Sequence, residues 1–525
     1  MRGVSKVELF IILAIYLGAL WLWTQPIQEN QLPYGEADAA SHFVVADAQS
    51  SSDHSLTTLP YYIDVRYGWD NQFRPHTLWY HPPYHMNFAL LQIFSGSRFL
   101  PIYLFNAILC TIMVLGTYFF MRKLFGLLPA ILSSILLIFS GRDYMVFLWG
   151  QWPERISYAF IPIILYAYFK YTEGYFAGKP KAYYLSVMGI LIGVNFYLHP
   201  GGLFHTLAAL GVFTLVLLIK ERKIPFRWKH LAIAAFIFIV MAAAFPFQTM
   251  SVIKLTQTEK ADAKNLGKIS RLFEWYPDAA DFNGAVPPTY FSYKDMNGIW
   301  TLPFLLAGIV LLLIRRKRQD WLLLSWLLSL YIMIHLDVIG KGRVHRSLAA
   351  EAHIFYPIIA IGFVWLITYL IKIMKLPKPV RPFLKMAAAI IFIIVAIMVN
   401  GKAAYGTLHN AYGGISRITP AQVEVAEWMK GHLADDALTE DFGTLTITKK
   451  RFMQFIAHRH LVKINFDDDL TEPDHLLFDY SDLVYLQQDP RYAPQITAMQ
   501  EQELLLEGKA TLLYDKNLIK VFKLE

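Results

Sequence analysis

The sequence predicts an α-helical polytopic membrane protein that ends in a small soluble α/β domain. Three observations support this fold class. The chain of 525 residues is 55% hydrophobic and 17% charged, with a mean hydropathy of +0.37, which is too apolar for a soluble protein of this length. Apolar runs long enough to cross a bilayer core of about 30 Å recur from Leu9 to about Val399. Beyond them the composition becomes that of an ordinary soluble domain.

The first apolar run, from Leu9 to Trp23, follows two basic residues. No small-residue cleavage pattern comes after it, so we expect an uncleaved signal-anchor rather than a removed signal peptide. The whole sequence contains about eleven candidate spans. They begin near Leu9, Leu100, Leu127, Ile156, Tyr184, Leu203, Leu231, Ile299, Leu322, Ile354 and Leu384.

Alternate connections between these spans are strongly basic. They include residues 122–123, 170–181, 220–229, 315–318 and 372–385. Because short loops rich in Lys and Arg stay in the cytoplasm, the N-terminus is predicted to be cytoplasmic and, after an odd number of spans, the tail extracytoplasmic. The same loops account for the net charge of +8, so no nucleic-acid partner is expected. We expect a multi-pass protein of the cell membrane, surrounded by membrane lipid.

The expected domains are residues 1–400, which form the membrane domain with a long external loop at 25–97, and residues 401–525, which form a linker and the soluble domain. The start of a tail helix is predicted at Thr419 and Pro420, where Gln422 completes a capping box. The last sixteen residues, ATLLYDKNLIKVFKLE, are typical of two strands around a turn.

The external loop contains the first candidate site, in the stretch PYGEADAASHF. Glu36, Asp38 and His42 follow the first span closely, near the expected outer membrane surface. Solvated loops are also rich in Asp and Glu, so the spacing alone does not assign catalysis. Two carboxylates and an imidazole are ligands that suit Mg²⁺ or Mn²⁺, and Asp38 and His42 are the expected metal ligands if the side chains converge.

The order of the following motifs resembles the GT-C superfamily of membrane glycosyltransferases. After the acidic cluster come WYHPPYH, an amphipathic segment, a Gly, and a span that ends in basic residues and FG; LLPAILSSILLIFSG and FLWGQWPERISYAF continue the pattern over the first third of the chain. The resemblance is to the ArnT/PMT/oligosaccharyltransferase-like group, which uses polyprenyl-phosphate sugars. It implies a membrane glycosyltransferase with Asp38 as the catalytic carboxylate.

The sequence departs from the oligosaccharyltransferases of that superfamily in one motif. Their Trp-Trp-Asp acceptor motif is absent, and the nearest imitation, EWYPDAADF, falls in a loop between spans rather than in the tail. The resemblance therefore implies transfer of a single sugar rather than of an oligosaccharide block. The acceptor stays open among a glycan, a lipid and a protein.

This chemistry requires a base for the acceptor hydroxyl and cations for the departing phosphate. We expect Asp38 to be the base, with Glu36 as its catalytic neighbour. The external segment HLDVIGKGRVHRS offers cations, and the planar fork of Arg suits phosphate oxygens. The expected substrate-binding residues are His42, His81, His85, Lys341, Arg343 and Arg346. Four other external residues are expected to pair with one another: Arg142, Asp143, Glu154 and Arg155.

Two other functions fit a polytopic chain. The first is a transporter or flippase of a lipid-linked substrate, which would place ionisable groups near the middle of its spans. The second is a non-catalytic membrane assembly protein whose tail binds a partner. The interiors of the spans are almost free of charge and the polar motifs gather at their outer ends, so the sequence favours an enzyme.

Overall fold

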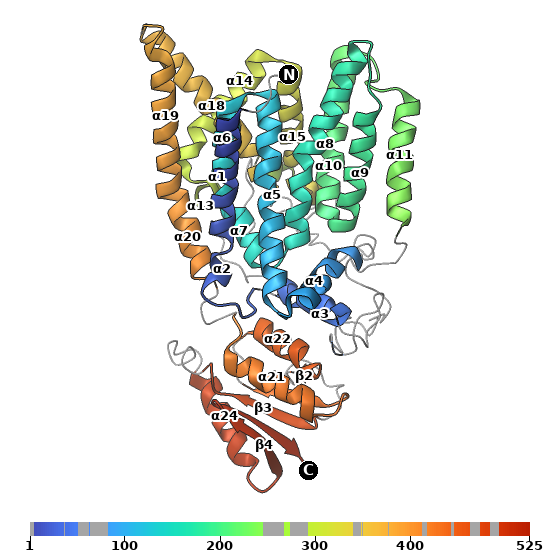
Figure 1. Ribbon diagram of the computed structural model, residues 1–525, viewed down its shortest axis with the longest axis vertical. Coiled ribbons are helices and arrows are strands. Elements are labelled where there is room, and N and C mark those ends of the chain that lie inside the picture. The colour runs from blue at the N-terminus through green and yellow to red at the C-terminus, as the bar shows by residue number, and fades with distance from the viewer. Residues whose placement is uncertain are drawn as a thin grey trace.

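The computed structural model describes residues 5–35, 37–50, 62, 82–244, 267–273, 292–339, 348, 350–375, 377–411, 417–442, 446–462, 473–482 and 493–525. These residues form a bundle of long helices above a small α/β domain (Figure 1). The predicted fold class is confirmed.

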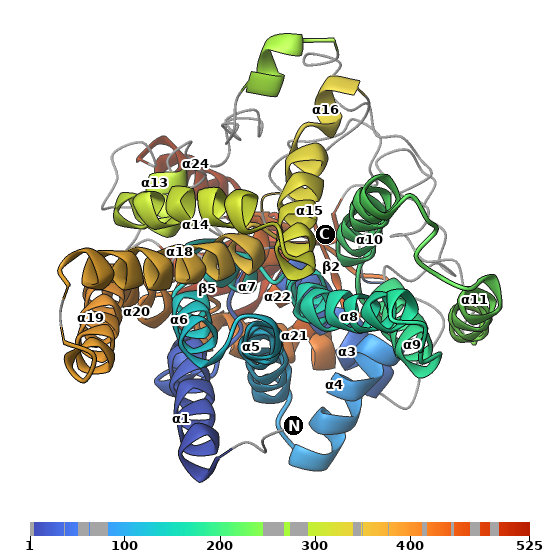
Figure 2. The ribbon, with the colours of Figure 1, turned by 90° about the horizontal axis from the view of Figure 1, so that it is seen from above.

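The membrane domain is built from apolar helices that run side by side (Figures 1 and 2). Helix α18 packs between α6 and α14, and α5 packs against α6 and α8. The long helices are α1 (Lys6–Trp23), α5 (Leu100–Leu124), α6 (Leu127–Ile138), α8 (Trp152–Phe176), α9 (Tyr183–Leu198), α10 (Pro200–Glu221), α11 (Trp228–Ala243), α14 (Leu302–Arg315), α15 (Arg318–Ile334), α18 (Ala352–Ile373) and α19 (Val380–Ala396).

Short helices cap one end of this bundle or join its spans. They are α2 (Gln25–Gln28), α3 (Ala37–Ser50), α4 (Pro82–Ser95), α7 (Gly141–Leu148), α13 (Tyr293–Asn297), α16 (Leu336–Ile339) and α20 (Lys402–His409), with single turns of 3₁₀ helix at Ile269–Phe273 and Ile299–Thr301 and a π-helical turn at Ile397–Gly401. The π-helical turn joins α19 to α20, so the helix runs on to His409 and the expected domain boundary at 400 lies inside it.

Every predicted span start lies in a described helix or its first turn. By length and composition, five helices of the described residues are able to cross a membrane, and a sixth span results if the bent pair of α6 and α7 counts as one. Three shorter apolar helices accompany them: α9, α11 and the segment Ile299–Arg315. The described chain is therefore a multi-pass membrane protein.

The basic connections meet at one end of the bundle, opposite the α/β domain (Figure 1). Arg122 forms an ion pair with Glu8 at 2.6 Å, so the start of α1 and the end of α5 share this end. Likewise, Arg318 forms an ion pair with Glu221 at 3.1 Å and joins the start of α15 to the end of α10. The basic connections thus lie at one end of the bundle, as expected from their alternation with non-basic connections along the sequence, from which the topology was predicted. Which end faces the cytoplasm stays a prediction.

The tail is a five-stranded mixed sheet covered by helices. Its elements are α21 (Pro420–His432), β1 (Leu438–Phe442), α22 (Ile447–Ala457), β2 (His460–Val462), β3 (His475–Asp479), α24 (Ala493–Leu505), β4 (Ala510–Lys516) and β5 (Ile519–Leu524). The strand order is β2-β1-β3-β5-β4, with β2, β1 and β3 parallel and β5 antiparallel to both of its neighbours. The predicted capping box of Thr419 and Gln422 and the predicted C-terminal strand pair are both confirmed.

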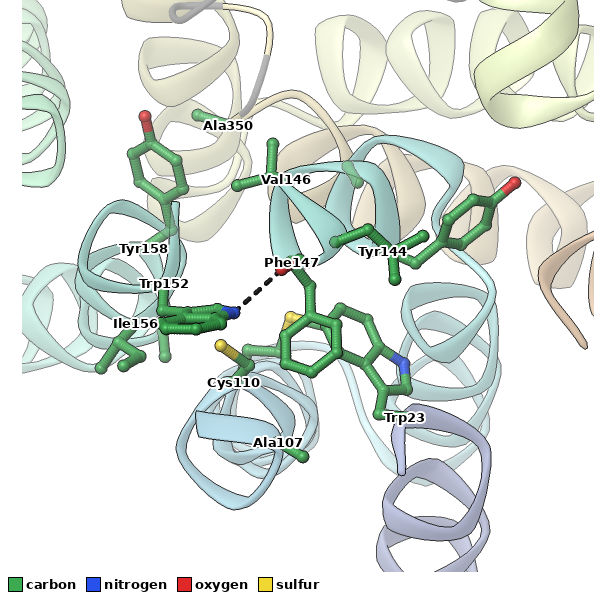
Figure 3. Close-up of a cluster of buried hydrophobic side chains, with 14 of the residues drawn as sticks. Trp23, Ala107, Cys110, Tyr144, Val146, Phe147, Trp152, Ile156, Tyr158 and Ala350 are labelled. Carbon is green, nitrogen blue, oxygen red and sulfur yellow. Dashed lines mark hydrogen bonds between the residues drawn. The ribbon is translucent and has the colours of Figure 1, made fainter. Parts of the chain in front are cut away.

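A cluster of buried apolar side chains joins α1, α5, α7 and α8 (Figure 3). The indole of Trp152 donates a hydrogen bond to the Phe147 carbonyl at 2.9 Å, which ties the first residue of α8 to α7. Phe147 packs against Trp23 at the end of α1, with ring centroids 5.2 Å apart. Cys110 is buried in the same cluster as a packing residue. These contacts join the last turn of α7 to the start of α8, where Glu154 and Arg155 lie.

Candidate active site

Asp38 lies in the first turn of α3 and is half-buried. The chain enters this helix through Gly35, whose φ of +122° suits only glycine. A side chain at Gly150, where φ is +85°, would overlap the backbone of Ala39. Two glycines therefore allow the start of α3 to sit directly on the turn between α7 and α8.

His42 and His85 form a buried pair beside Asp38. His42 Nδ1 and His85 Nε2 are 2.9 Å apart, which is a hydrogen-bond distance, and His42 lies one helical turn after Asp38 on the same face of α3. Burial lowers the pKa of His42 to about 4, although the Asp38 charge opposes the shift, and burial also lowers the pKa of His85. Both rings are therefore neutral at pH 7. The structure brings together two of the predicted substrate-binding residues, from α3 and α4.

A second buried group joins three helices at the same end of the bundle. Arg155 in α8 forms an ion pair with Asp143 in α7 at 2.8 Å, and both side chains are fully buried. The same nitrogen of Arg155 also lies 2.8 Å from His353 Nε2 at the start of α18. We call Asp143, Arg155 and His353 the membrane-domain cluster. The predicted pairing among the external charged residues is confirmed for Asp143 and Arg155.

The membrane-domain cluster has polar atoms without hydrogen-bond partners among the described residues. His353 Nε2 lies 2.8 Å from Arg155 Nη1 and 3.3 Å from Asp143 Oδ1, so it accepts from the guanidinium in one tautomer and donates to the carboxylate in the other. Among the described residues, the buried Nδ1 of His353, Nε and Nη2 of Arg155 and Oδ2 of Asp143 have no hydrogen-bond partner. Most buried polar groups in proteins are paired. The cluster therefore offers unused donors that suit an anionic or hydroxyl-rich ligand.

The two groups adjoin through residues of α8 and α10. Tyr158 donates a hydrogen bond to Glu154 at 2.8 Å, and Glu154 lies 3.9 Å from His199. The His42 ring packs against Trp152 at the start of α8, with ring centroids 5.6 Å apart, so the loop helix adjoins the helix that carries Arg155. This end of the bundle thus holds carboxylate, imidazole and guanidinium groups from α3, α4, α7, α8 and α18 and from His199, the residue before α10.

The remaining predicted site residues lie outside the described residues. They are Glu36, His81, Lys341, Arg343 and Arg346. Residues near the predicted cation segment do reach the site, because His353 belongs to the cluster and Glu351 accepts a hydrogen bond from Asn297 at 3.0 Å. The sequence interpretation missed His353. The available signal was its place beside Glu351, just after the basic segment.

The expected Mg²⁺ or Mn²⁺ site was tested against the donor atoms. Within the described ranges, no group of three or more His, Cys, Asp or Glu side chains is arranged to hold a metal ion. Glu36, the remaining member of the expected set, is not among them. Asp38 and His42 as metal ligands therefore stay a prediction, and no catalytic step below uses a metal.

Comparison with solved structures defines the class of fold. AglB, an archaeal oligosaccharyltransferase from Archaeoglobus fulgidus solved with an inhibitory peptide and a dolichol-phosphate, is similar with a TM-score of 0.59 at 12% identity, over 99% of this chain and 75% of that one. ArnT from Cupriavidus metallidurans is similar with a TM-score of 0.58 at 10% identity, over 99% and 98% of the two chains. ArnT bound to undecaprenyl phosphate gives 0.57 at 10% identity, with the same coverage.

The chain therefore has the fold of the GT-C membrane glycosyltransferases, as its motif order predicted. It belongs to the family described as a family of unknown function, DUF6541, which matches residues 5–439. A comparison with curated proteins finds no significant match.

Proposed function

We propose that this protein is a membrane glycosyltransferase that moves a single sugar from a polyprenyl-phosphate carrier to an acceptor outside the cytoplasm. The observation that carries the proposal is that the start of α3, which carries Asp38, packs on the turn between α7 and α8, the two helices that hold the buried Asp143–Arg155 pair in a GT-C fold. The structures of AglB with dolichol-phosphate and ArnT with undecaprenyl phosphate support a lipid phosphate as the donor's carrier.

In the proposed reaction, Asp38 accepts the proton of the acceptor hydroxyl. The acceptor oxygen then forms a bond to the anomeric carbon as the bond from that carbon to the phosphate oxygen breaks, and the electron pair leaves with the polyprenyl phosphate. Attack on the face opposite the leaving group inverts the anomeric configuration. General-base catalysis of this kind contributes about 10²- to 10⁴-fold in rate.

The other residues bind and orient the substrates. Among the described residues, two donors of Arg155 lack partners and suit the oxygens of the departing phosphate, and the unpartnered Nδ1 of His353 lies in the same cluster. The predicted cations Lys341, Arg343 and Arg346 would add to this charge. The neutral pair of His42 and His85 can both donate and accept, which suits sugar hydroxyls. Glu36 is proposed as the catalytic neighbour of Asp38.

The test is transfer by the purified protein from a radiolabelled polyprenyl-phosphate sugar, with a membrane extract as the source of glycan, lipid and protein acceptors. Asp38→Asn should lower the transfer rate at least about 100-fold because the base is lost. The matched control is Asp436→Asn, an exposed residue of the tail that should behave as wild type. An Asp38→Asn protein with full activity would refute the assignment of the base.

The alternative of a transporter or flippase is tested in the same preparation. The buried charged residues lie in the first turns of α7, α8 and α18 rather than at mid-span, which disfavours transport. Movement of a lipid-linked substrate across liposomes without sugar transfer would reverse this choice.

A further inference from the structure

We propose that Arg98 is a positioning residue that fastens the catalytic-loop helix α3 to the tail domain, so that the tail is required for sugar transfer itself and not only for recognising the acceptor. The inference rests on the proposed function, because it assumes that Asp38 of α3 is the base. It assigns a role in the reaction to a contact far from Asp38 in the chain.

Arg98 lies just before α5 and binds α3 with both arms of its guanidinium. Nε donates to Asp47 Oδ1 at 2.8 Å, and Nη2 donates to Asp47 Oδ2 at 2.7 Å. This bidentate geometry fixes the orientation of both side chains. The Arg98 guanidinium also lies over the Phe43 ring, 5.7 Å from its centroid, so it contacts α3 at two successive turns.

The tail domain also contacts Arg98. We call Asp47, Arg98, Glu427 and His458 the junction. Arg98 forms an ion pair with Glu427 of α21, and its Nη2 lies 3.4 Å from both the Ile456 carbonyl oxygen and His458 Nε2. His458, at the end of α22, also lies 3.3 Å from Asp47 Oδ2. One guanidinium therefore contacts the external loop and two helices of the tail.

The junction is buried, which makes its geometry matter. Asp47 and His458 are 5% and 8% exposed. Burial alone would raise the pKa of Asp47, but hydrogen bonds from Arg98 and His458 outweigh it and lower this pKa to about 2. Asp47 is therefore a buried anion that Arg98 and His458 stabilise. Removing one partner of a buried ion pair leaves an uncompensated charge.

The junction holds the far end of the helix that carries Asp38. Asp38 and Asp47 are nine residues apart, which corresponds to about 14 Å along a helix. The near end of α3 is fixed by its contacts with Gly35 and Gly150, and the far end by Arg98. If the far end is released, the helix can pivot about its near end, and Asp38 loses its alignment. A misplacement of about 1 Å can cost about 100-fold in rate.

The first experiment compares three variants of the full-length protein for kcat and donor KM, using the smallest acceptor that the wild type accepts. Arg98→Met should lower kcat about 100-fold with donor KM unchanged, because binding groups remain while the base is misaligned. Arg98→Lys keeps the charge but loses the fork, and should recover part of kcat. Asp436→Asn changes an exposed tail residue outside these contacts and should behave as wild type.

The second experiment uses pH to separate positioning from a general loss of structure. Asp47 of α3, Arg98 and Lys430 of α21 act on His458, Glu427 of α21 pairs with Arg98, and the Tyr62 ring stacks on His458 with centroids 4.4 Å apart. In Arg98→Met, protonated His458 still offers Asp47 a cationic partner. Activity relative to wild type should therefore be higher at about pH 5.5 than at about pH 8, and lost as pH rises. The double variant Arg98→Met/His458→Phe should lack this pH dependence.

The outcomes separate this inference from the proposed function. If the wild type transfers sugar and Arg98→Met retains full kcat, or loses kcat equally at both pH values, the positioning role is wrong and the proposed function stands. If the wild type transfers no sugar, the proposed function itself fails. A fall in kcat with partial rescue by Lys and by low pH supports the inference.

Discussion

Two buried charged groups in this protein are built differently. In the tail, Lys449, Asp482, Asp479 and Gln422 form a cluster in which every carboxylate oxygen is paired: Lys449 contacts Asp482 at 2.6 Å, and Gln422 donates to both aspartates, at 2.6 Å and 3.2 Å. Ser481 completes the shell around Asp479. The membrane-domain cluster is just as buried, yet each of its three residues has a polar atom that finds no hydrogen-bond partner in the described part of the chain.

This difference separates a structural role from a binding role. Each unsatisfied buried polar group costs about 1–3 kcal/mol, so a protein retains such groups where something other than the protein fills their bonding capacity. The tail cluster needs nothing more and serves packing. The membrane-domain cluster fits the expectation for a site that receives a polar ligand.

The largest expected effect comes from replacing the ion pair of the membrane-domain cluster. Changing both partners, as Asp143→Leu/Arg155→Met, avoids an unpaired buried charge and should leave the fold intact. Sugar transfer should still fall at least about 100-fold because the cation for the phosphate is lost. Transfer rate and thermal unfolding are measured on the same preparation. A folded double variant with wild-type transfer would remove the cluster from the site.

The matched change in the tail should have a much smaller effect on activity. Asp482→Leu/Lys449→Met replaces a fully buried pair of the same kind. Because that pair serves packing, kcat should stay within about threefold of wild type while the unfolding temperature of the tail changes. A loss of transfer as large as in the membrane-domain variant, with the protein folded, would contradict the contrast between the two clusters.

The smallest expected effect is a pH dependence of tail stability. Burial and the neighbouring Asp482 raise the pKa of Asp479 to about 7. The folded state therefore binds this proton more tightly than the unfolded state, so stability falls as pH rises from about 4 to about 7. Hydrogen exchange of the β3 amides, corrected for intrinsic rates, should show this slope, and Asp479→Asn should flatten it. An unchanged slope in the variant would show that another group is responsible.

Features that depend on local sequence were predictable. Apolar runs placed the helices, and Thr419 and Gln422 marked the start of α21. The reason is that spans and helix caps are set by residues within a few positions of one another. The pairing of His42 with His85 crosses 43 residues, and the sequence indicated only that both would bind substrate.

Contacts that depend on tertiary packing were not predictable. Arg155 meets His353 across 198 residues, and His458 meets Asp47 across 411 residues. No local sequence pattern at one partner identifies the other, because the contact forms only when the helices between them pack and bring these helix ends together. The same holds for Arg98, because the surrounding sequence shows only a single basic residue before a span.

The most direct test of the central claim measures donor binding and donor cleavage separately in Asp38→Asn. Native mass spectrometry would report binding of the polyprenyl-phosphate sugar, and release of free polyprenyl phosphate in the presence of acceptor would report cleavage. The account predicts that the variant binds the donor as wild type does and releases almost no polyprenyl phosphate. Release at the wild-type rate would contradict it.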